Sequence, residues 1–187
     1  MTTQIRRRLL AFRALTPALV IGLASACSSP ADPSGDDDPC ALRPVVPGGS
    51  VELGRDGNPF TPIVDGQDMD LVVGSQGLDM FVLGARTQDL EVGSGDREGV
   101  VVFSAFDAGG QLISFDFSCR IREFVPSTSP GSVSGSMILA SAYGLPLRPE
   151  FITPQLEGSR VTLQAEVRDT AGRRAIGRIT VIVHLPI

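Results

Sequence analysis

The 187-residue sequence predicts an all-β fold, an antiparallel β-sandwich of about seven to nine strands. Short segments with apolar side chains at every second position, which is typical of strands with one buried face, recur beyond residue 45. Turn-forming residues separate these segments about every 8–12 residues. Outside the N-terminal segment, no window of ten or more residues carries the apolar stripe of an amphipathic helix.

Between residues 51 and 121 the sequence contains five expected strands, at residues 51–54, 69–74, 80–86, 100–107 and 112–121. The last is the most regular, because its odd-numbered residues from Ile113 to Ile121 are apolar or cysteine and its even-numbered ones are polar. The sequence Ala108-Gly109-Gly110 is expected to form a hairpin turn before it. The sequence therefore places Cys119 on the buried side of that strand.

The C-terminal hairpin is equally clear. Residues 161–168 alternate between apolar and polar, the turn falls at residues 169–172, and an inward row follows at Ile179, Val181, Val183 and Leu185. A weaker strand is expected at residues 136–142. Residues 156–163 and 166–173 resemble the last hairpin of immunoglobulin-like domains in bacterial surface proteins. The resemblance implies an immunoglobulin-like architecture, and the absence of Trp argues against a closer relation to antibody domains.

Residues 1–26 are typical of a secretory signal peptide. Three arginines at positions 6–8 precede an apolar stretch at 14–23, and the small residues Ala24, Ser25 and Ala26 follow. The apolar stretch is shorter than the roughly 20 residues that a membrane-spanning helix needs. The segment therefore indicates export rather than a permanent transmembrane helix.

The sequence Leu23-Ala24-Ser25-Ala26-Cys27 resembles the lipobox of bacterial lipoproteins, with its Leu one position earlier than usual. The resemblance implies cleavage before Cys27, attachment of diacylglycerol to its thiol and acylation, for example by palmitate, of the new amino group. Two or more acyl chains give stable membrane anchoring. Ser28 after the cysteine implies sorting to the outer membrane, on its periplasmic face or at the cell surface. The alternative is an ordinary secretory signal cut near Ala26.

Residues 27–39 are expected to form a flexible tether, because Ser, Pro, Asp and Gly dominate them and little apolar surface is available for burial. The β-sandwich domain is expected at residues 40–187. With Cys27 assigned to lipid, Cys40 and Cys119 remain, and an exported chain meets an oxidising compartment. The sequence therefore predicts a Cys40–Cys119 disulfide, with two unpaired thiols as the alternative.

Charge is divided unevenly along the chain. Four arginines and no acidic residue lie within residues 1–26, so all 21 acidic residues belong to the exported part. A strongly acidic domain is repelled by phosphate backbones and by anionic lipid surfaces, which disfavours nucleic acid as a partner.

Three carboxylates, Asp65, Asp68 and Asp70, are weak candidates for a calcium site because carboxylate oxygens are the ligands that Ca²⁺ prefers. The alternative is that Asp65-Gly66 forms a turn and that Asp68 and Asp70 are outward residues of a strand. His184 is the only histidine, and the spacing Gly-x-Ser-x-Gly is absent. No catalytic residues and no cofactor are therefore predicted.

A segment from Asn58 to Gln67, followed by the turn Gly74-Ser75-Gln76-Gly77, resembles lipoproteins of myxobacteria and their relatives. No activity accompanies that resemblance. The resulting hypothesis is a membrane-anchored envelope lipoprotein with a non-enzymatic binding or structural domain. Its partner would be an envelope or extracellular protein, contacted through loops at residues 126–135 and 143–155. Within the second loop, residues 143–147 are unusually apolar and are expected to fold inward over the end of the core, with partner contact as the alternative. The alternative function is a small envelope hydrolase or a calcium-dependent binding module.

Overall fold

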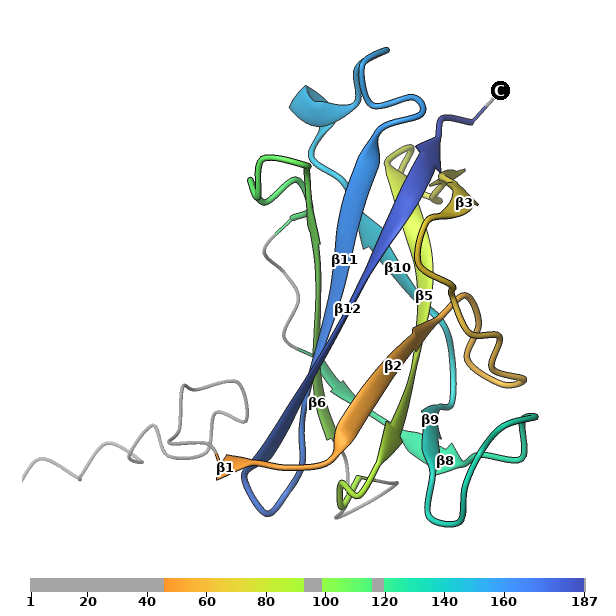
Figure 1. The fold of residues 1–187 in the computed structure, drawn as a ribbon. Helices are drawn as coiled ribbons and strands as arrows, with labels where there is room; N and C mark the ends of the chain where they lie inside the picture. The colour runs from red at the N-terminus through yellow and green to blue at the C-terminus, as the bar shows by residue number, and fades with distance from the viewer. Residues whose placement is uncertain (1–45, 93–98, 116–119, 187) are drawn as a thin grey trace, which may run out of the picture. The chain divides into compact units, whose positions relative to one another are not determined.

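The computed structural model of the protein describes residues 46–92, 99–115 and 120–186, which all belong to one compact unit, Asp36–Ile187. The predicted all-β class is confirmed. Within the described ranges two six-stranded, mainly antiparallel sheets surround a shared core, and the helical structure is a three-residue 3-10 turn, Pro149–Phe151 (Figure 1).

The first sheet has the order β1-β12-β11-β6-β7, with β3 also paired to β12. Its centre is the predicted C-terminal hairpin, in which β11 and β12 pair antiparallel along the whole of β11. The strands of this sheet are β1 (Val46–Pro47), β3 (Gln67–Asp70), β6 (Gly99–Phe106), β7 (Arg120–Arg122), β11 (Arg160–Arg168) and β12 (Arg173–His184).

The second sheet is built around one long strand, β5. Its C-terminal half pairs with β2 and β9, and its N-terminal half pairs with β4 and β10, while β8 extends the sheet beyond β9. The strands of this sheet are β2 (Ser50–Gly54), β4 (Val72–Val73), β5 (Asp79–Gln88), β8 (Phe124–Pro126), β9 (Met137–Leu139) and β10 (Tyr143–Pro146).

The core lies between the two sheets and is filled by the inward side chains of both. In β11 the alternation predicted from the sequence is confirmed, since Val161, Leu163, Ala165 and Val167 are all fully buried. The opposing sheet contributes Phe81, Leu83 and other side chains to the same cluster. Burying a large apolar side chain contributes about 1.5–3 kcal/mol, so this shared layer is the main source of stability.

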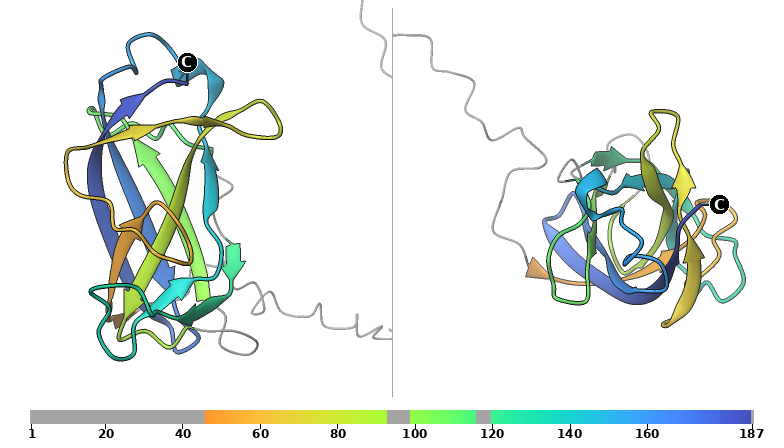
Figure 2. Two further views of the ribbon diagram at one scale, coloured as in Figure 1. Left: turned by 90° about the vertical axis from the view of Figure 1, so that its right-hand side faces the viewer. Right: turned by 90° about the horizontal axis from the view of Figure 1, so that it is seen from above.

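The chain changes sheet three times over short distances, from β1 to β2, from β3 to β4 and from β7 to β8. Residues 112–115 also connect the sheets, because Leu112 pairs with Phe106 of β6 and Ser114 pairs with Leu147 after β10. The two sheets therefore curve around the core, as the view from above in Figure 2 shows.

Several expectations about the strands require correction. The sheets are not wholly antiparallel, since β1 and β3 both pair parallel with β12. The described residues form twelve strands rather than seven to nine, because the sheet changes divide the chain into two- and three-residue pieces that an alternation pattern cannot reveal.

Two segments also differ from their predicted form. Residues 112–121 are not one continuous alternating strand, since Ser114 is buried beside Ile113 and Ile121 is 45% exposed on β7. Residues 112–115 connect the two sheets, so the side chains there do not keep one buried face, while residues 116–119 lie outside the described residues. Residues 143–146 were expected to be a loop but form β10, which pairs with β5. Leu145 and Leu147 are buried, which confirms that this segment folds inward.

Candidate functional site

A ten-residue loop, residues 127–136, connects β8 and β9. Five of its ten residues are serines, and we call it the serine loop. Except for Ser136, it falls within residues 126–135, where the sequence predicted partner contacts. Since β8 and β9 are adjacent antiparallel strands, a two-residue turn would suffice to connect them.

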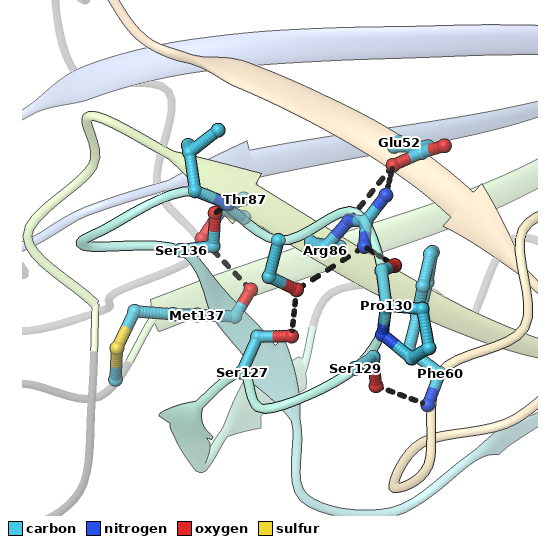
Figure 3. Close-up of polar contacts among 11 residues, drawn as sticks. Glu52, Phe60, Arg86, Thr87, Ser127, Ser129, Pro130, Ser136 and Met137 are labelled. Atoms are coloured by element: carbon cyan, nitrogen blue, oxygen red, sulfur yellow. Dashed lines mark hydrogen bonds and ion pairs between the residues drawn. The ribbon is translucent and has the colours of Figure 1, made fainter.

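Arg86 of β5 anchors the serine loop to the sheet (Figure 3). Its guanidinium donates to the Pro130 carbonyl and the Ser132 hydroxyl, both at 3.2 Å, and its Nε donates to Glu52 at 2.8 Å. The same group lies over the Phe60 ring, 4.8 Å from its centroid. The Arg86 side chain is only 12% exposed, so a largely desolvated cation ties together β2, β5 and the loop.

Hydrogen bonds of the loop's own serines complete this arrangement. The Ser129 hydroxyl accepts from the backbone N–H of Phe60 at 2.9 Å, and the Ser127 and Ser132 hydroxyls are 2.5 Å apart. The Ser136 hydroxyl accepts from the backbone N–H of Val133 at 3.2 Å. Because both ends and the middle of the loop have fixed partners, its backbone is held in one conformation before any partner arrives.

The surface that the serine loop presents is partly apolar. Val133 is 51% exposed at the loop surface. A pocket of about 130 Å³ lies beside it, lined by residues of β2, β5 and the loop, including Glu52, Arg86 and Ser136. The pocket is too small for most organic ligands but matches a single inserted side chain. The arrangement is therefore suited to protein contact.

The second predicted contact segment, residues 143–155, contributes to a different pocket. This pocket has a volume of about 280 Å³ and lies between the Asp107–Gly109 turn and residues 150–160. Ile113 and Leu156 contribute buried apolar surface to it, while Asp107, Glu150 and Arg160 supply charge.

Val46, the first described residue, pairs with Arg173 at the start of β12. The described chain therefore begins at the end of β12 that is opposite to His184.

His184 lies between two carboxylates at the end of β12. Its Nε2 is 3.0 Å from Asp68 Oδ1, and its Nδ1 is 2.7 Å from Glu157 Oε1. The other oxygen of Glu157 accepts from the backbone N–H of Leu185 at 2.7 Å. Hydrogen bonds to Asp68 and then Glu157 raise the pKa of His184 above its ordinary value, and the Leu185 N–H and His184 lower the pKa of Glu157. The cluster therefore favours an imidazolium held by two carboxylates.

The three predicted calcium ligands have separate roles in the structure. Asp65 accepts from the Thr180 N–H at 3.0 Å within a turn whose Gly66 has a positive φ of 75°. Asp68 bonds His184, and Asp70 is an exposed residue of β3. Among the described residues, no group of three or more His, Cys, Asp or Glu side chains is placed to hold a metal ion.

The predicted lipidation site, Cys27, and the predicted disulfide partners, Cys40 and Cys119, lie outside the described residues. These assignments stay predictions. Within residues 46–92, 99–115 and 120–186, no helix is long and apolar enough to cross a membrane.

Arg86 is the residue of this candidate site that sequence reasoning missed. On an alternating strand it is indistinguishable from an ordinary outward polar residue, because its partners come from residues 52, 60, 130 and 132. The sequence signal that was available is the Ser-Thr-Ser-Pro-Gly-Ser run, which marks the loop but not its anchor.

Comparison with known proteins does not assign the chain to a family. No family model matches it, and no curated protein matches it. Among solved structures, it is similar to the DNA-binding domain of Cep-1, the C. elegans ortholog of p53, with a TM-score of 0.32 and 10% identity over 74% of this chain and 91% of that one. It is also similar to a DUF4466 family protein from Parabacteroides merdae, with a TM-score of 0.27 and 14% identity over 73% of this chain and 44% of that one. Neither likeness identifies a function.

Proposed function

We propose that this protein is a lipid-anchored lipoprotein of the bacterial cell envelope whose immunoglobulin-like two-sheet domain binds another envelope or extracellular protein through the serine loop. The domain acts as a binding module and not as an enzyme. Membrane attachment comes from acylated Cys27, and residues 27–39 link the anchor to the domain. The outer membrane is the proposed location.

The single observation that carries the binding role is the fixed serine loop. Ten residues connect two neighbouring strands, and a largely buried arginine holds them in place. Hairpin loops usually have about two to five residues, so this loop is longer than the pairing of β8 with β9 requires, and specific contacts order it. A loop ordered in advance loses less conformational entropy on binding, so contacts with a partner contribute more of their free energy to affinity.

The proposed anchor is supported by the order of elements in residues 1–27, a cationic start, an apolar stretch and small residues before Cys27. The intact mass of the protein extracted from membranes tests it. We expect the mass of a chain that starts at Cys27 and carries acyl groups, and we expect Cys27→Ala to release the protein from the membrane fraction. An unacylated mature chain would overturn the anchor while leaving the binding role open.

Photo-crosslinking in intact cells tests the binding role. A photoreactive amino acid replaces Val133 of the serine loop, and a matched variant carries it in place of Ile176 on β12. Both positions hold exposed apolar side chains, at 51% and 41% exposure, so folding and labelling should be comparable. We expect a discrete protein adduct from position 133 and none from position 176.

Two outcomes of this crosslinking experiment would contradict the proposed binding surface. The absence of an adduct at position 133, or the same adducts from both positions, would reject the serine loop as the binding surface. As a further control, Arg86→Met releases the loop from its anchor and should reduce the position-133 adduct while the domain stays folded.

A further inference from the structure

A second pocket, away from the serine loop, is lined by Arg122 of β7 and by residues around the start of β10. Its volume is about 460 Å³, within the range of about 300–1,000 Å³ typical of small-molecule sites. The lining residues are Arg122, Glu123, Leu139, Ala140, Ser141, Ala142, Tyr143 and Gly144. Half of these eight residues are small, namely Ala140, Ser141, Ala142 and Gly144, and the larger side chains are those of Arg122, Glu123, Leu139 and Tyr143.

Tyr143, the only tyrosine of the chain, gives this pocket a fixed aromatic wall. Its ring stacks on Phe103 of β6, with centroids 5.5 Å apart and an interplanar angle of 12°. Phe103 is only 2% exposed, so it forms a rigid support. The Tyr143 ring is therefore partly buried and packs against the core on this support.

Arg122 also lies over the Tyr143 ring, with its guanidinium carbon 5.3 Å from the centroid. Ring contact fixes the plane of a guanidinium while leaving its N–H groups free to donate. Four other arginines, at positions 86, 168, 173 and 174, pair with carboxylates. Arg122 has no carboxylate partner in the described part of the chain, although the domain is rich in acids.

We propose that this pocket binds the carboxylate of a small organic acid or of a peptide C-terminus through the Arg122 guanidinium. A planar guanidinium matches a carboxylate with two parallel hydrogen bonds, and Tyr143 and Leu139 offer apolar surface to the remainder of the ligand. Arg120, two residues earlier on the same strand, adds positive charge, whereas Glu123 opposes it. Within the lining itself, one guanidinium faces one carboxylate, so a singly charged ligand is favoured over phosphate.

The absence of Trp and the presence of one Tyr make the test specific, because tyrosine ring signals report on this pocket alone. The full chain, extracted in detergent and labelled with ¹³C in tyrosine, is titrated with butyrate and with N-acetyl-leucine at constant ionic strength. N-acetyl-leucinamide, which lacks the carboxylate, is the ligand control. We expect saturable shifts of the Tyr143 ring signals with the acids and none with the amide.

Three variants connect those shifts to Arg122. Arg122→Gln should weaken binding about tenfold or more, because it removes a charge-assisted bidentate contact. Arg122→Lys, which keeps the charge without the planar fork, should bind weakly. Arg160→Gln, a matched control at another exposed arginine without a carboxylate partner in the described residues, should bind as the parent does.

The relative affinities distinguish the two sources of carboxylate. Tighter binding of N-acetyl-leucine than of butyrate indicates a peptide terminus, and the reverse indicates a free organic acid. Either result supports a carboxylate site. Saturable shifts that persist in Arg122→Gln, equal shifts with the amide, preferential binding of inorganic phosphate, or no saturable shift with either acid would overturn the proposal.

Discussion

Individual polar side chains in this domain connect backbone segments that are distant in sequence. Asp169 is the clearest case, since its side chain is fully buried and accepts from the N–H groups of Glu91, Ala171 and Arg173. Burial opposes its ionisation, yet these hydrogen bonds and the Arg173 guanidinium together lower its pKa. Arg86 and His184 have similar roles elsewhere. Single substitutions at such residues should therefore affect whole segments.

His184 should make stability depend on pH. Its pKa is raised in the folded protein, so its stabilising effect is complete below the ordinary value of 6.5 and is lost as the pH rises through the folded value. Urea unfolding measured from pH 6 upward should show the free energy of unfolding falling through this range. In His184→Gln that dependence should disappear. A parent protein whose stability stays constant there would contradict the proposed imidazolium.

Glu157 should make the stability of the fold depend on pH in the opposite direction to His184. Its pKa is lowered, so its contribution is present above the ordinary value of 4.5 and lost as the pH falls through the folded value. The combined effect of the two groups leaves this end of the domain most stable between the two titrations.

Among the structural elements, the serine loop and β12 depend most clearly on tertiary contacts. The loop is held by Arg86, whereas β12 is paired on both sides and also lies close to β2 of the other sheet. Position 177 of β12 requires glycine, because a Cβ there would be 2.4 Å from the Val51 carbonyl oxygen. Both elements therefore depend on residues that look ordinary in the sequence.

Substitution of Arg86 tests how the serine loop is held in place. Arg86→Met removes the guanidinium that bonds Pro130 and Ser132, and we expect a loss of about 1–3 kcal/mol of unfolding free energy, since the freed Glu52 remains partly solvated. Hydrogen exchange should accelerate within residues 127–136. Arg178→Met, which removes an exposed contact to Gln164, should change stability by less than about 0.5 kcal/mol.

Gly177→Ala tests the close approach of β2 and β12. The added methyl group meets backbone, which cannot rotate away, so the strands must separate, and we expect destabilisation of about 1–3 kcal/mol in thermal or urea unfolding. Ile176→Ala, at the exposed neighbouring position, should have little effect. Equal effects of the two substitutions would mean that β2 and β12 are not in tight contact.

At the scale of the whole molecule, the two sheets form one cooperative unit, because the chain crosses between them repeatedly and one core serves both. Their separate unfolding is therefore not expected. The chain's length and the all-β topology place most stabilising contacts between residues far apart in sequence.

The predicted Cys40–Cys119 disulfide would add a covalent connection over about 80 residues, worth roughly 4–5 kcal/mol in the chain-entropy model. We expect the exported protein to resist alkylation at both cysteines until it is reduced. The free energy of unfolding should then fall by about that amount, and Cys40→Ala/Cys119→Ala should match the reduced protein. Two cysteines that react without reduction would contradict the pairing.

The sequence by itself determined the all-β class, the C-terminal hairpin and most of the longer strands, because alternation and turn residues are local signals. It also marked the serine loop and the outward position of His184. Only the tertiary structure decided the parallel pairing of β1 and β3, the crossings between sheets, and the partners of Arg86, Arg122 and His184. These depend on contacts between segments tens of residues apart, for which a local pattern carries no information.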